Sequence, residues 1–485
     1  MTATTEDARE ITVDDRAHIY LDGKWVEPTG EQDLVAVTNS GSGEVLAKVA
    51  QASMADVDRA VQAARLATER WSSSSVAERA ALLERLADEI EARADEIACT
   101  VALEVGTPLR MSRLLQVGLP LSVLRGYAAD VRELELEQTI GNSLVHRTPV
   151  GVVGAITPWN YPLHQIAAKL GAAIAAGCGT VLKPANVAPL SAFILAEAAD
   201  AAGVPAGLLN VVTGEGPGVG EAIAGHRDVG IVSFTGSTRA GARVAAVAAA
   251  NITKVALELG GKSASIIAED ADLTTAVKAS VRHAFTNSGQ TCTAWTRMIV
   301  PRSRLVEVDE LVAAEMAKMP VTHPLAEGAR LGPLASAAQK RTVEDYLEVA
   351  RAEGLREIAR GSVDDLGHEG GYYVAPVAYS DVPRGSRLAQ EEIFGPVLVI
   401  VGHDGIDDAV AIANDSDYGL AGGVWSADEE RAVAIAKRIR TGQIDINGAR
   451  FNPRAPFGGF GRSGIGRELG RFGIEEFLEV SAIQQ

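Results

Sequence analysis

Short apolar runs alternate with helical segments between residues 150 and 234. The run at 150–156 is rich in valine and isoleucine, as is typical of a strand buried in a parallel sheet. The predicted strands lie at residues 150–156, 180–182, 208–212 and 230–234, and the predicted helices at 163–176, 190–202 and 221–224. Strands that alternate with helices predict an α/β fold with a doubly wound, mostly parallel sheet.

A predicted hairpin interrupts this alternation just before its first strand. Residues 136–140 and 143–148 read as two strands joined by the two-residue turn Gly141-Asn142. Residues 261–448 then repeat the strand–helix alternation and predict a second α/β domain. A chain of 485 residues is long enough for two or three domains.

The clearest helix signal lies nearer the N-terminus. Ser75 and Glu78 form a capping-box pattern, which places a helix start at this point. Apolar side chains then recur at helical spacing and are Leu82, Leu83, Leu86, Ile90 and Ile97. With charged residues on the opposite face, the pattern predicts one amphipathic surface helix through this segment.

Charge, cysteine content and hydropathy restrict the partners of the chain. The net charge of −18 argues against nucleic acid and anionic membranes as partners, since both require a basic surface. Three widely spaced cysteines do not suggest a disulfide framework, and a free thiol favours the reducing cytosol. Met1 to Asp15 has no apolar core of a signal peptide, and the apolar stretch 163–182 contains Lys169. That stretch falls short of the ~20 apolar residues that span a bilayer, so we expect a soluble, cytoplasmic protein.

One cysteine lies in an unusual local setting. Cys292 sits within Asn287-Ser288-Gly289-Gln290-Thr291-Cys292-Thr293, a small, polar segment, whereas a cysteine placed for packing usually has apolar neighbours. Gly289 permits a close approach of the backbone to a ligand. Cys99 and Cys178 lack this setting and are expected to be structural. We interpret Cys292 as a candidate nucleophile.

Two further groups complete a set suited to covalent catalysis. Glu258 precedes the glycine pair Gly260-Gly261 and is a candidate general base. Asn160, in Thr157-Pro158-Trp159-Asn160, offers an uncharged amide that can donate to a developing oxyanion. The histidines show no H-x-x-x-H spacing and the cysteines no C-x-x-C spacing, so we expect no catalytic metal.

At these residues the chain resembles the NAD(P)-dependent aldehyde dehydrogenase superfamily. The resemblance runs nearly the full length, in the family's order of motifs. The matching segments are Asp22-Gly23-Lys24-Trp25, Pro158-Trp159-Asn160, Lys183-Pro184, Phe234-Thr235-Gly236-Ser237-Thr238, Glu258-Leu259-Gly260-Gly261-Lys262, Gly289-Gln290-Thr291-Cys292, Glu391-Glu392-Ile393-Phe394-Gly395-Pro396, Pro456-Phe457-Gly458-Gly459 and Ser463-Gly464-Ile465-Gly466-Arg467-Glu468.

The resemblance implies a Rossmann-like cofactor domain, although the usual glycine fingerprint G-x-G-x-x-G is absent. Gly236 to Gly241 has P-loop-like spacing, but no lysine and hydroxyl follow Gly241, which argues against an NTPase. The residues that the resemblance assigns to NAD are Trp159, Lys183, Asn186, Gly236, Ser237, Gly241, Leu259, Glu392 and Phe394. Ser237 would lie near the pyrophosphate, at a helix N-terminus.

Position 186 departs from the NAD-preferring members, which commonly carry a glutamate there. Asn186 can bond a ribose hydroxyl, but it does not repel a 2′-phosphate as a carboxylate would. From this position alone we expect the protein to use NAD+ and also to accept NADP+, with NAD+ preferred.

By the same resemblance, the reaction is oxidation of an aldehyde to a carboxylate. Cys292 attacks the aldehyde and forms a thiohemiacetal whose oxyanion Asn160 stabilises; hydride transfer leaves a thioester, and water activated by Glu258 hydrolyses it. Members that transfer the acyl group to coenzyme A typically lack the glutamate, so Glu258 favours hydrolysis. A non-enzymatic binding protein of this family is the alternative from another class, and such proteins usually lose the nucleophile or the base.

The resemblance also predicts a substrate tunnel, and it assigns residues to the wall. These are Tyr161, Thr291, Thr293, Phe451 and Phe457. The aromatic rings favour an apolar or aromatic aldehyde. Arg450 or Arg454, if it faced the tunnel, would instead favour a carboxylated semialdehyde; we favour exposure of both arginines to solvent.

The expected organisation has three parts. Residues 1–130 and 149–260 form the dinucleotide-binding domain, and residues 261–448 form the catalytic domain. Residues 131–148 and 470–485 form a hairpin and a C-terminal tail, which in the family make subunit contacts. The resemblance therefore implies a homodimer or homotetramer.

Overall fold

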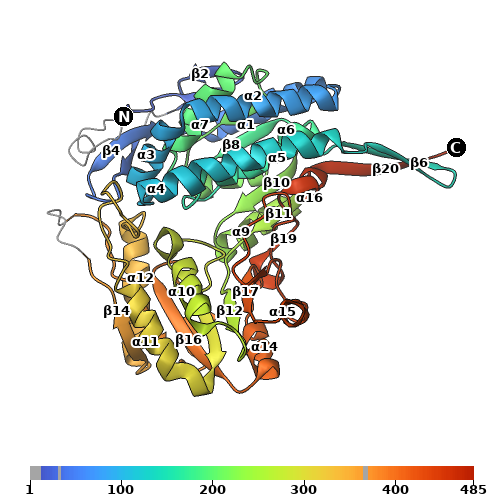
Figure 1. The fold of residues 1–485 in the computed structure, drawn as a ribbon. Helices are drawn as coiled ribbons and strands as arrows, with labels where there is room; N and C mark the ends of the chain where they lie inside the picture. The colour runs from blue at the N-terminus through green and yellow to red at the C-terminus, as the bar shows by residue number, and fades with distance from the viewer. Residues whose placement is uncertain (1–12, 31–33, 364–369) are drawn as a thin grey trace.

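The computed structural model describes residues 13–30, 34–363 and 370–485. Most of the N-terminal segment Met1 to Asp15, on which the expectation about a signal peptide was based, lies outside these residues. Figure 1 shows an upper layer built around one sheet, a lower layer built around another, and a narrow arm that projects sideways from the upper layer. The α/β class predicted from the sequence is confirmed.

The sheet of the upper layer has eight strands among the described residues, in the order β19-β11-β10-β7-β8-β9-β1-β2. The strands are β1 (Ile19–Leu21), β2 (Lys24–Val26), β7 (Val152–Ile156), β8 (Thr180–Lys183), β9 (Leu209–Val211), β10 (Val229–Thr235), β11 (Lys254–Glu258) and β19 (Gly464–Ile465). The five central strands are parallel, and the edge strands β1, β2 and β19 are antiparallel to their neighbours.

The order of the strands reverses between β7 and β10. From β7 the chain adds β8 and β9 on one side, and it then returns to add β10 and β11 on the other. The predicted doubly wound sheet is thus present. In such sheets ligands bind at the carboxyl ends of the strands, beside the point of reversal.

Helices pack on both faces of this sheet. They are α1 (Met54–Trp71), α2 (Val76–Ala92), α3 (Ala94–Val105), α4 (Leu109–Met111), α5 (Leu119–Arg132), α6 (Pro162–Ala176), α7 (Leu190–Ala201), α8 (Glu221–Ala224) and α9 (Thr238–Ala249), with π-helical turns at Ser112–Gly118 and Gly216–Gly220. Every residue of α6 is buried, which explains the apolar composition of this helix on all sides.

The helix signal at Ser75 is correct, but the predicted helix is too long. Ser75 and Glu78 form the capping box of α2 as expected. The helix ends at Ala92, and Ile97 belongs to α3, because Arg93 leaves the helical conformation with φ −107° and ψ 18°. The Arg93 guanidinium donates to the carbonyl of Ile194 at 3.2 Å. The apolar spacing continues across the break, so periodicity could not reveal it.

The lower layer contains a second sheet of seven strands within the described chain, in the order β14-β15-β16-β13-β12-β17-β18. The strands are β12 (Ala264–Ile267), β13 (Arg297–Pro301), β14 (Arg356–Arg360), β15 (Val377–Ser380), β16 (Val397–His403), β17 (Gly422–Trp425) and β18 (Asp445–Ile446). The helices are α10 (Leu273–Ala284), α11 (Leu305–Met316), α12 (Ala337–Ala352), α13 (Arg387–Gln390), α14 (Ile406–Asn414) and α15 (Glu429–Ala436). Only β14 is antiparallel to its neighbour among these strands.

The arm is the predicted hairpin together with the end of the chain. Strands β5 (Glu137–Ile140) and β6 (Ser143–Pro149) pair across the two-residue turn, and β20 (Leu478–Gln484) adds to β6 after α16 (Gly470–Glu476). The arm extends away from the body in Figure 1. A small separate sheet pairs β3 (Leu34–Thr38) with β4 (Val45–Ala50).

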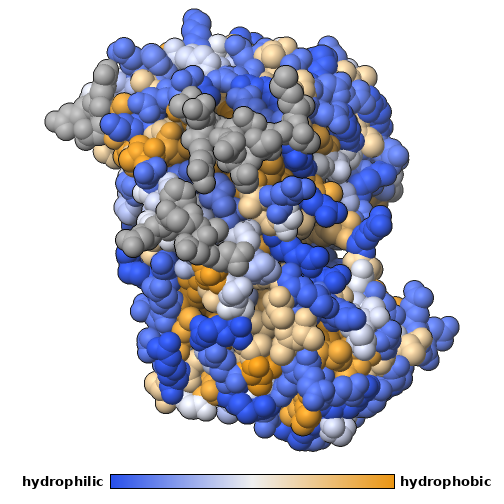
Figure 2. Space-filling model, turned by 60° about the vertical axis from the view of Figure 1, so that its left-hand side comes forward, coloured by the Kyte–Doolittle hydropathy of each residue, from blue (hydrophilic) through white to orange (hydrophobic). Residues whose placement is uncertain are grey.

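Figure 2 shows hydrophilic side chains over most of one face, with apolar groups in smaller patches between them. Among the described residues, no helix is long and apolar enough to cross a bilayer. The same residues include no group of three or more His, Cys, Asp or Glu side chains that could hold a metal ion.

Candidate active site

The loop before Cys292 has a strained backbone. It follows α10 as a short helical turn, Thr286–Gly289, in which Asn287 has φ 52° and Ser288 has φ 56°. Left-handed conformations cost non-glycine residues about 1–2 kcal/mol each. Gly289 continues the turn with φ 75°, and a Cβ atom there would lie 2.1 Å from the carbonyl oxygen of Gly395. The glycine therefore allows the loop to pack directly against the segment that follows Glu392.

Buried hydrogen bonds hold this loop in place. Thr107 donates to the Asn287 side chain at 2.7 Å, and Ser288 donates to the carbonyl of Gly332 at 2.9 Å. The Gln290 side-chain oxygen accepts from the backbone N–H of Ala335 at 2.9 Å. These contacts come from two separate parts of the chain, around Thr107 and at residues 332–335, so the tertiary structure fixes the backbone from which Cys292 projects.

Asn160 lies beside this loop, between β7 and α6. Its side-chain Nδ2 donates to the carbonyl of Gln290 at 3.0 Å, and its own carbonyl accepts from Gln116 at 2.9 Å and from Asn287 at 3.1 Å. An amide nitrogen has two N–H groups, and Gln290 takes one of them. The second N–H group of the Asn160 side chain is available to a ligand atom placed next to Cys292.

Two carboxylates, one of them that of the predicted base Glu258, lie close enough to Cys292 to affect the pKa of its thiol. Burial, and then the nearby carboxylates of Glu392 and Glu258, raise the pKa of the thiol to about 12. The backbone N–H groups of Cys292 and Thr293 act in the opposite direction, by hydrogen bonding to the sulfur. The thiol is thus held largely protonated until a substrate or cofactor changes its surroundings.

Glu258 ends strand β11 and faces the same region. Its side chain is buried, and neither carboxylate oxygen has a hydrogen-bond partner within the described chain. Burial, and then the charge of Glu468, raise its pKa well above the ordinary value. An unpaired carboxyl with a raised pKa is well suited to take a proton from water.

Sequence reasoning missed Lys169, a buried lysine whose charge acts on Glu258. Lys169, on α6, is fully buried and forms an ion pair with Glu468, and it also donates to the Thr235 hydroxyl at 2.7 Å. The charge of Lys169 lowers the pKa of Glu258 while the charge of Glu468 raises it. A lysine inside an apolar helix was the available signal, since such a residue is seldom buried without a partner.

The predicted nicotinamide contacts lie next to the nucleophile. Glu392 accepts from the backbone N–H of Gly261 at 2.9 Å, and burial raises its pKa to about 7. Phe394 has a positive φ of 58°, and its ring meets the Trp159 ring edge-on at a centroid distance of 5.5 Å. The structure therefore brings Trp159, Glu392 and Phe394 together.

The predicted pyrophosphate contacts lie where β10 enters α9. Ser237 is the N-cap of α9 and accepts from the backbone N–H of Ala240 at 3.3 Å. Its side chain is exposed, at a helix end that favours negative charge. Gly236 hydrogen-bonds to the Glu258 carbonyl, and a Cβ atom on Gly241 would lie 2.4 Å from the Leu259 side chain. The four residues thus form one contiguous group at the end of the sheet.

Lys183 and Asn186 follow β8 as expected, but a third residue joins them. Lys183 is buried and donates to the carbonyl of Pro184 at 3.0 Å; burial lowers its pKa to about 8, against an opposing effect of Glu215. Asn186 donates to the carboxylate of Glu215 at 3.1 Å. Glu215 lies in the connection after β9, so no local pattern around position 186 could reveal this contact.

The predicted tunnel residues form two contacts. Tyr161 and Thr291 share a hydrogen bond of 2.8 Å, and burial raises the pKa of the Tyr161 hydroxyl. The Phe451 and Phe457 rings meet edge-on at 6.2 Å, with Phe457 buried and Phe451 partly exposed. Thr293 follows Cys292 and is partly buried.

Neither arginine of the alternative semialdehyde site has the setting that such a site requires. Arg454 pairs with the buried carboxylate of Asp130, at 2.9 Å from its Nε. Arg450 is exposed. The Nε and Nη2 atoms of Arg454 both donate to Asp130, so this side of the guanidinium is already occupied by a carboxylate.

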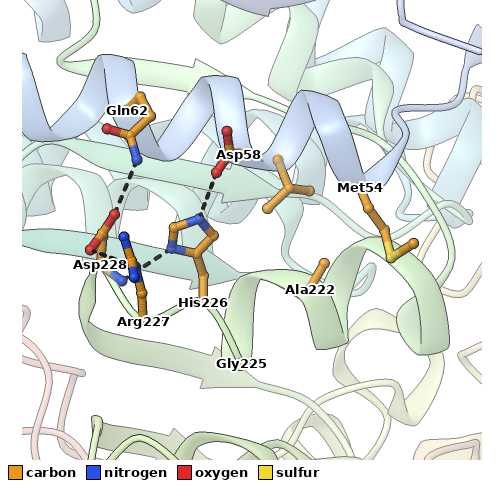
Figure 3. A pocket seen from close by; sticks show the side chains of 9 residues that line it. Met54, Asp58, Gln62, Ala222, Gly225, His226, Arg227 and Asp228 are labelled. Carbon is orange, nitrogen blue, oxygen red and sulfur yellow. Dashed lines mark hydrogen bonds and ion pairs between the residues drawn. The ribbon is translucent and has the colours of Figure 1, made fainter.

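A pocket of about 490 Å³ lies elsewhere, between α1 and the segment that follows α8. Figure 3 shows His226 directed toward Asp58, at 3.2 Å, and Gln62 directed toward Asp228, at 3.0 Å. None of the predicted site residues lines this pocket. Its polar groups already pair with one another.

Comparisons with known proteins identify the family of the chain. The model of the aldehyde dehydrogenase family matches residues 25–483. A 3-succinoylsemialdehyde-pyridine dehydrogenase of Pseudomonas is 45% identical, over 97% of this chain and 98% of that protein.

Two solved structures are also similar. Aldehyde dehydrogenase C of Pseudomonas syringae, a cysteine-to-alanine mutant in complex with NAD+ and octanal, has a TM-score of 0.94 and 45% identity, over 96% of each chain. A betaine aldehyde dehydrogenase of Staphylococcus aureus, in complex with NAD+ and with a BME-modified cysteine, has a TM-score of 0.92 and 33% identity, over 96% of this chain and 95% of that one. With the motifs, the geometry and these similarities in agreement, the chain belongs to the aldehyde dehydrogenase family.

Proposed function

We propose that the protein oxidises an apolar aldehyde to its carboxylate with NAD+, through a covalent intermediate on Cys292. Its family makes it an NAD-dependent aldehyde dehydrogenase. The observation that carries the detailed assignment is that a partly buried thiol, an unpaired buried carboxyl and a side-chain amide lie together at the Cys292 loop.

The described residues fit a dinucleotide at the carboxyl edge of the first sheet. The N-terminus of α9 with Ser237 is suited to the pyrophosphate, and the Asn186 side-chain oxygen is buried without a partner and free to accept from a ribose hydroxyl. Glu392 and Phe394 would hold the nicotinamide half next to Cys292. When bound, NAD+ supplies the hydride acceptor for the oxidation.

Formation of the intermediate begins at sulfur. The Cys292 thiol releases its proton to solvent, the sulfur adds to the aldehyde carbon, the carbonyl electron pair moves to oxygen, and the thiohemiacetal oxyanion results. The free N–H of Asn160 and the backbone N–H of Cys292 donate to that oxygen. Donors fixed in advance need little reorganisation when the charge develops, and one such donor contributes about 10²–10³-fold to kcat. Loss of hydride from the same carbon leaves a thioester.

Release of the product depends on Glu258. Its carboxylate takes a proton from water, the resulting hydroxide adds to the thioester carbon, and the Cys292 thiolate leaves as the carboxylic acid forms. Lys169 and Glu468 are the buried charged residues next to Glu258, and they form an ion pair. The protonation of Glu258 therefore depends on this ion pair.

The tunnel residues favour an apolar substrate. The edge-on rings of Phe451 and Phe457 present apolar surface, and the Tyr161 and Thr291 hydroxyls are bonded to each other. Arg454 pairs with Asp130. The octanal bound to the P. syringae relative is in accord with this preference.

A panel of aldehydes tests the proposal. Octanal, benzaldehyde and a short semialdehyde that carries a carboxylate are compared, with NADH formation followed by absorbance. We expect higher kcat/KM for the two apolar aldehydes. A preference for the carboxylated substrate that Arg450→Ala abolishes would overturn the apolar assignment, and no turnover of any aldehyde despite bound NAD+ would overturn the catalytic one.

We also propose that the eight-stranded sheet, the seven-stranded sheet and the arm correspond to the three expected parts of the chain, and that the arm makes contacts between copies of the chain. Ile140, Val480 and Ile483 are exposed on the arm, which has little contact with the body in Figure 1. Light scattering should give a dimer or a tetramer for wild type and a smaller species for Val480→Asp with Ile483→Asp. Monomeric wild type would refute the proposal. The need for a reduced Cys292 favours the cytoplasm as the compartment.

A further inference from the structure

Two strand ends converge on the adenosine side of the proposed cofactor site. Asn186 follows β8, and Glu215 follows β9, the next strand in the sheet. The Asn186 Nδ2 atom donates to the Glu215 carboxylate at 3.1 Å and lies 3.4 Å from the Gln51 side-chain oxygen. In doubly wound sheets, an acidic side chain near the end of the second strand binds the ribose of NAD. Here β8 is the second strand, counted from β7.

The hydrogen bond between Asn186 and Glu215 determines which of their side-chain atoms remain for a ligand. A carboxylate can only accept hydrogen bonds, so the amide nitrogen of Asn186 must point toward Glu215. The Asn186 side-chain oxygen therefore does not contact Glu215. It is buried and has no partner in the described chain. The pair therefore presents acceptor oxygens from both side chains and no free donor.

This arrangement suits two hydroxyl groups and not a phosphate. The 2′- and 3′-hydroxyls of a ribose are donors that can satisfy both oxygens. A 2′-phosphate offers acceptors and negative charge, which the carboxylate repels. Lys183 is buried close by; it donates one N–H to the carbonyl of Pro184, and its positive charge already interacts with the Glu215 carboxylate.

We propose that Glu215, positioned by Asn186, makes the protein select NAD+ over NADP+. Glu215 and the Asn186 oxygen accept from the adenosine ribose hydroxyls, and the carboxylate of Glu215 excludes a 2′-phosphate. The proposal rests on the proposed cofactor site. It replaces the expectation that the protein discriminates weakly between NAD+ and NADP+, which was based on position 186. Glu215, after the next strand of the sheet, supplies the carboxylate that is absent from position 186.

Binding measurements test this selection without turnover. The Kd values of NADH and NADPH are measured by nicotinamide fluorescence for wild type, Glu215→Gln and Glu221→Gln. Glu221→Gln is the matched control: it removes the same charge six positions later, where Arg243 holds the carboxylate at 2.7 Å and 2.9 Å. We expect Glu215→Gln to shift the ratio of the two Kd values toward NADPH by about tenfold, while the control keeps the wild-type ratio.

Ionic strength gives a second readout that a purely structural role would not change. Glu215 is exposed, so the discrimination that it provides should shrink as salt is raised from 20 to 500 mM, and Glu215→Gln should lose that dependence. An unchanged ratio in Glu215→Gln, or an equal shift in Glu221→Gln, would overturn the proposal. A failure of the catalytic proposal would appear differently, as tight NADH binding without oxidation of any aldehyde.

Discussion

The side-chain amide of Asn160 donates to the backbone carbonyl of Gln290 at 3.0 Å, although 130 positions separate the two residues in the sequence. This contact joins the loop after β7 to the loop that carries Cys292. It supports a strained turn, and in the proposed mechanism the second N–H of the same amide donates to the oxyanion, which would give Asn160 both a structural and a chemical role.

Replacement of Asn160 separates these two contributions. Asn160→Ala should lower kcat by about 10²–10³-fold, because the oxyanion loses a fixed donor. Thr107→Val removes a hydrogen bond to the same loop, 2.7 Å from Asn287, without touching the oxyanion, and serves as the control. Steady-state kinetics and thermal unfolding are measured together. Equal losses of kcat in the two variants would assign Asn160 a structural role only.

Cys292 should be the only cysteine that catalysis requires. Cys292→Ala is expected to abolish turnover and to retain NAD+ binding, because the thiol provides the covalent bond to the substrate. Cys99→Ala, which alters a partly buried thiol outside the site, should keep nearly full activity. Initial rates with octanal provide the measurement. Substantial turnover by Cys292→Ala would refute covalent catalysis at this residue.

Glu258 should matter most after hydride transfer. Glu258→Gln keeps the shape of the side chain but cannot accept a proton, so we expect one rapid turnover per active subunit followed by slow release. Stopped-flow absorbance should show the burst of NADH, and mass spectrometry should find the acyl group on Cys292. Absence of both signals would assign Glu258 to an earlier step, such as removal of the thiol proton.

A buried carboxyl outside the site should make stability depend on pH. Glu104 is fully buried, accepts from the backbone N–H of Leu190 at 3.2 Å, and has a pKa that burial raises to about 8. The folded state therefore holds a proton that the unfolded state loses from about pH 4.5 upward, and stability falls as pH rises from there to about 8.

The decline should be at most about 1.4 kcal/mol per pH unit from this group. In Glu104→Gln, which stays neutral, the unfolding temperature should fall less between pH 5 and pH 8 than in wild type. Differential scanning calorimetry at several pH values measures the difference. Parallel pH profiles of the two proteins would show that Glu104 is not the group responsible.

The sequence by itself predicted the doubly wound sheet and the hairpin, which the structure contains, and it supplied the candidate nucleophile, base and amide donor. Strands and helices follow from local apolar periodicity, and a polar segment around a cysteine is also a local feature. For the same reason the sequence missed the break at Arg93, since apolar spacing continues from Ile90 to Ile97 across it.

The tertiary structure alone decided the contacts between distant segments. Lys169 meets Glu468 across 299 positions, and Asn186 meets Glu215 across 29. A contact between residues so far apart produces no periodic pattern in the sequence. A buried charge loses its hydration, and only a partner that the fold brings from elsewhere in the chain offsets that loss. The electrostatic environment of the base and the proposed cofactor selectivity therefore depend on packing and not on local pattern.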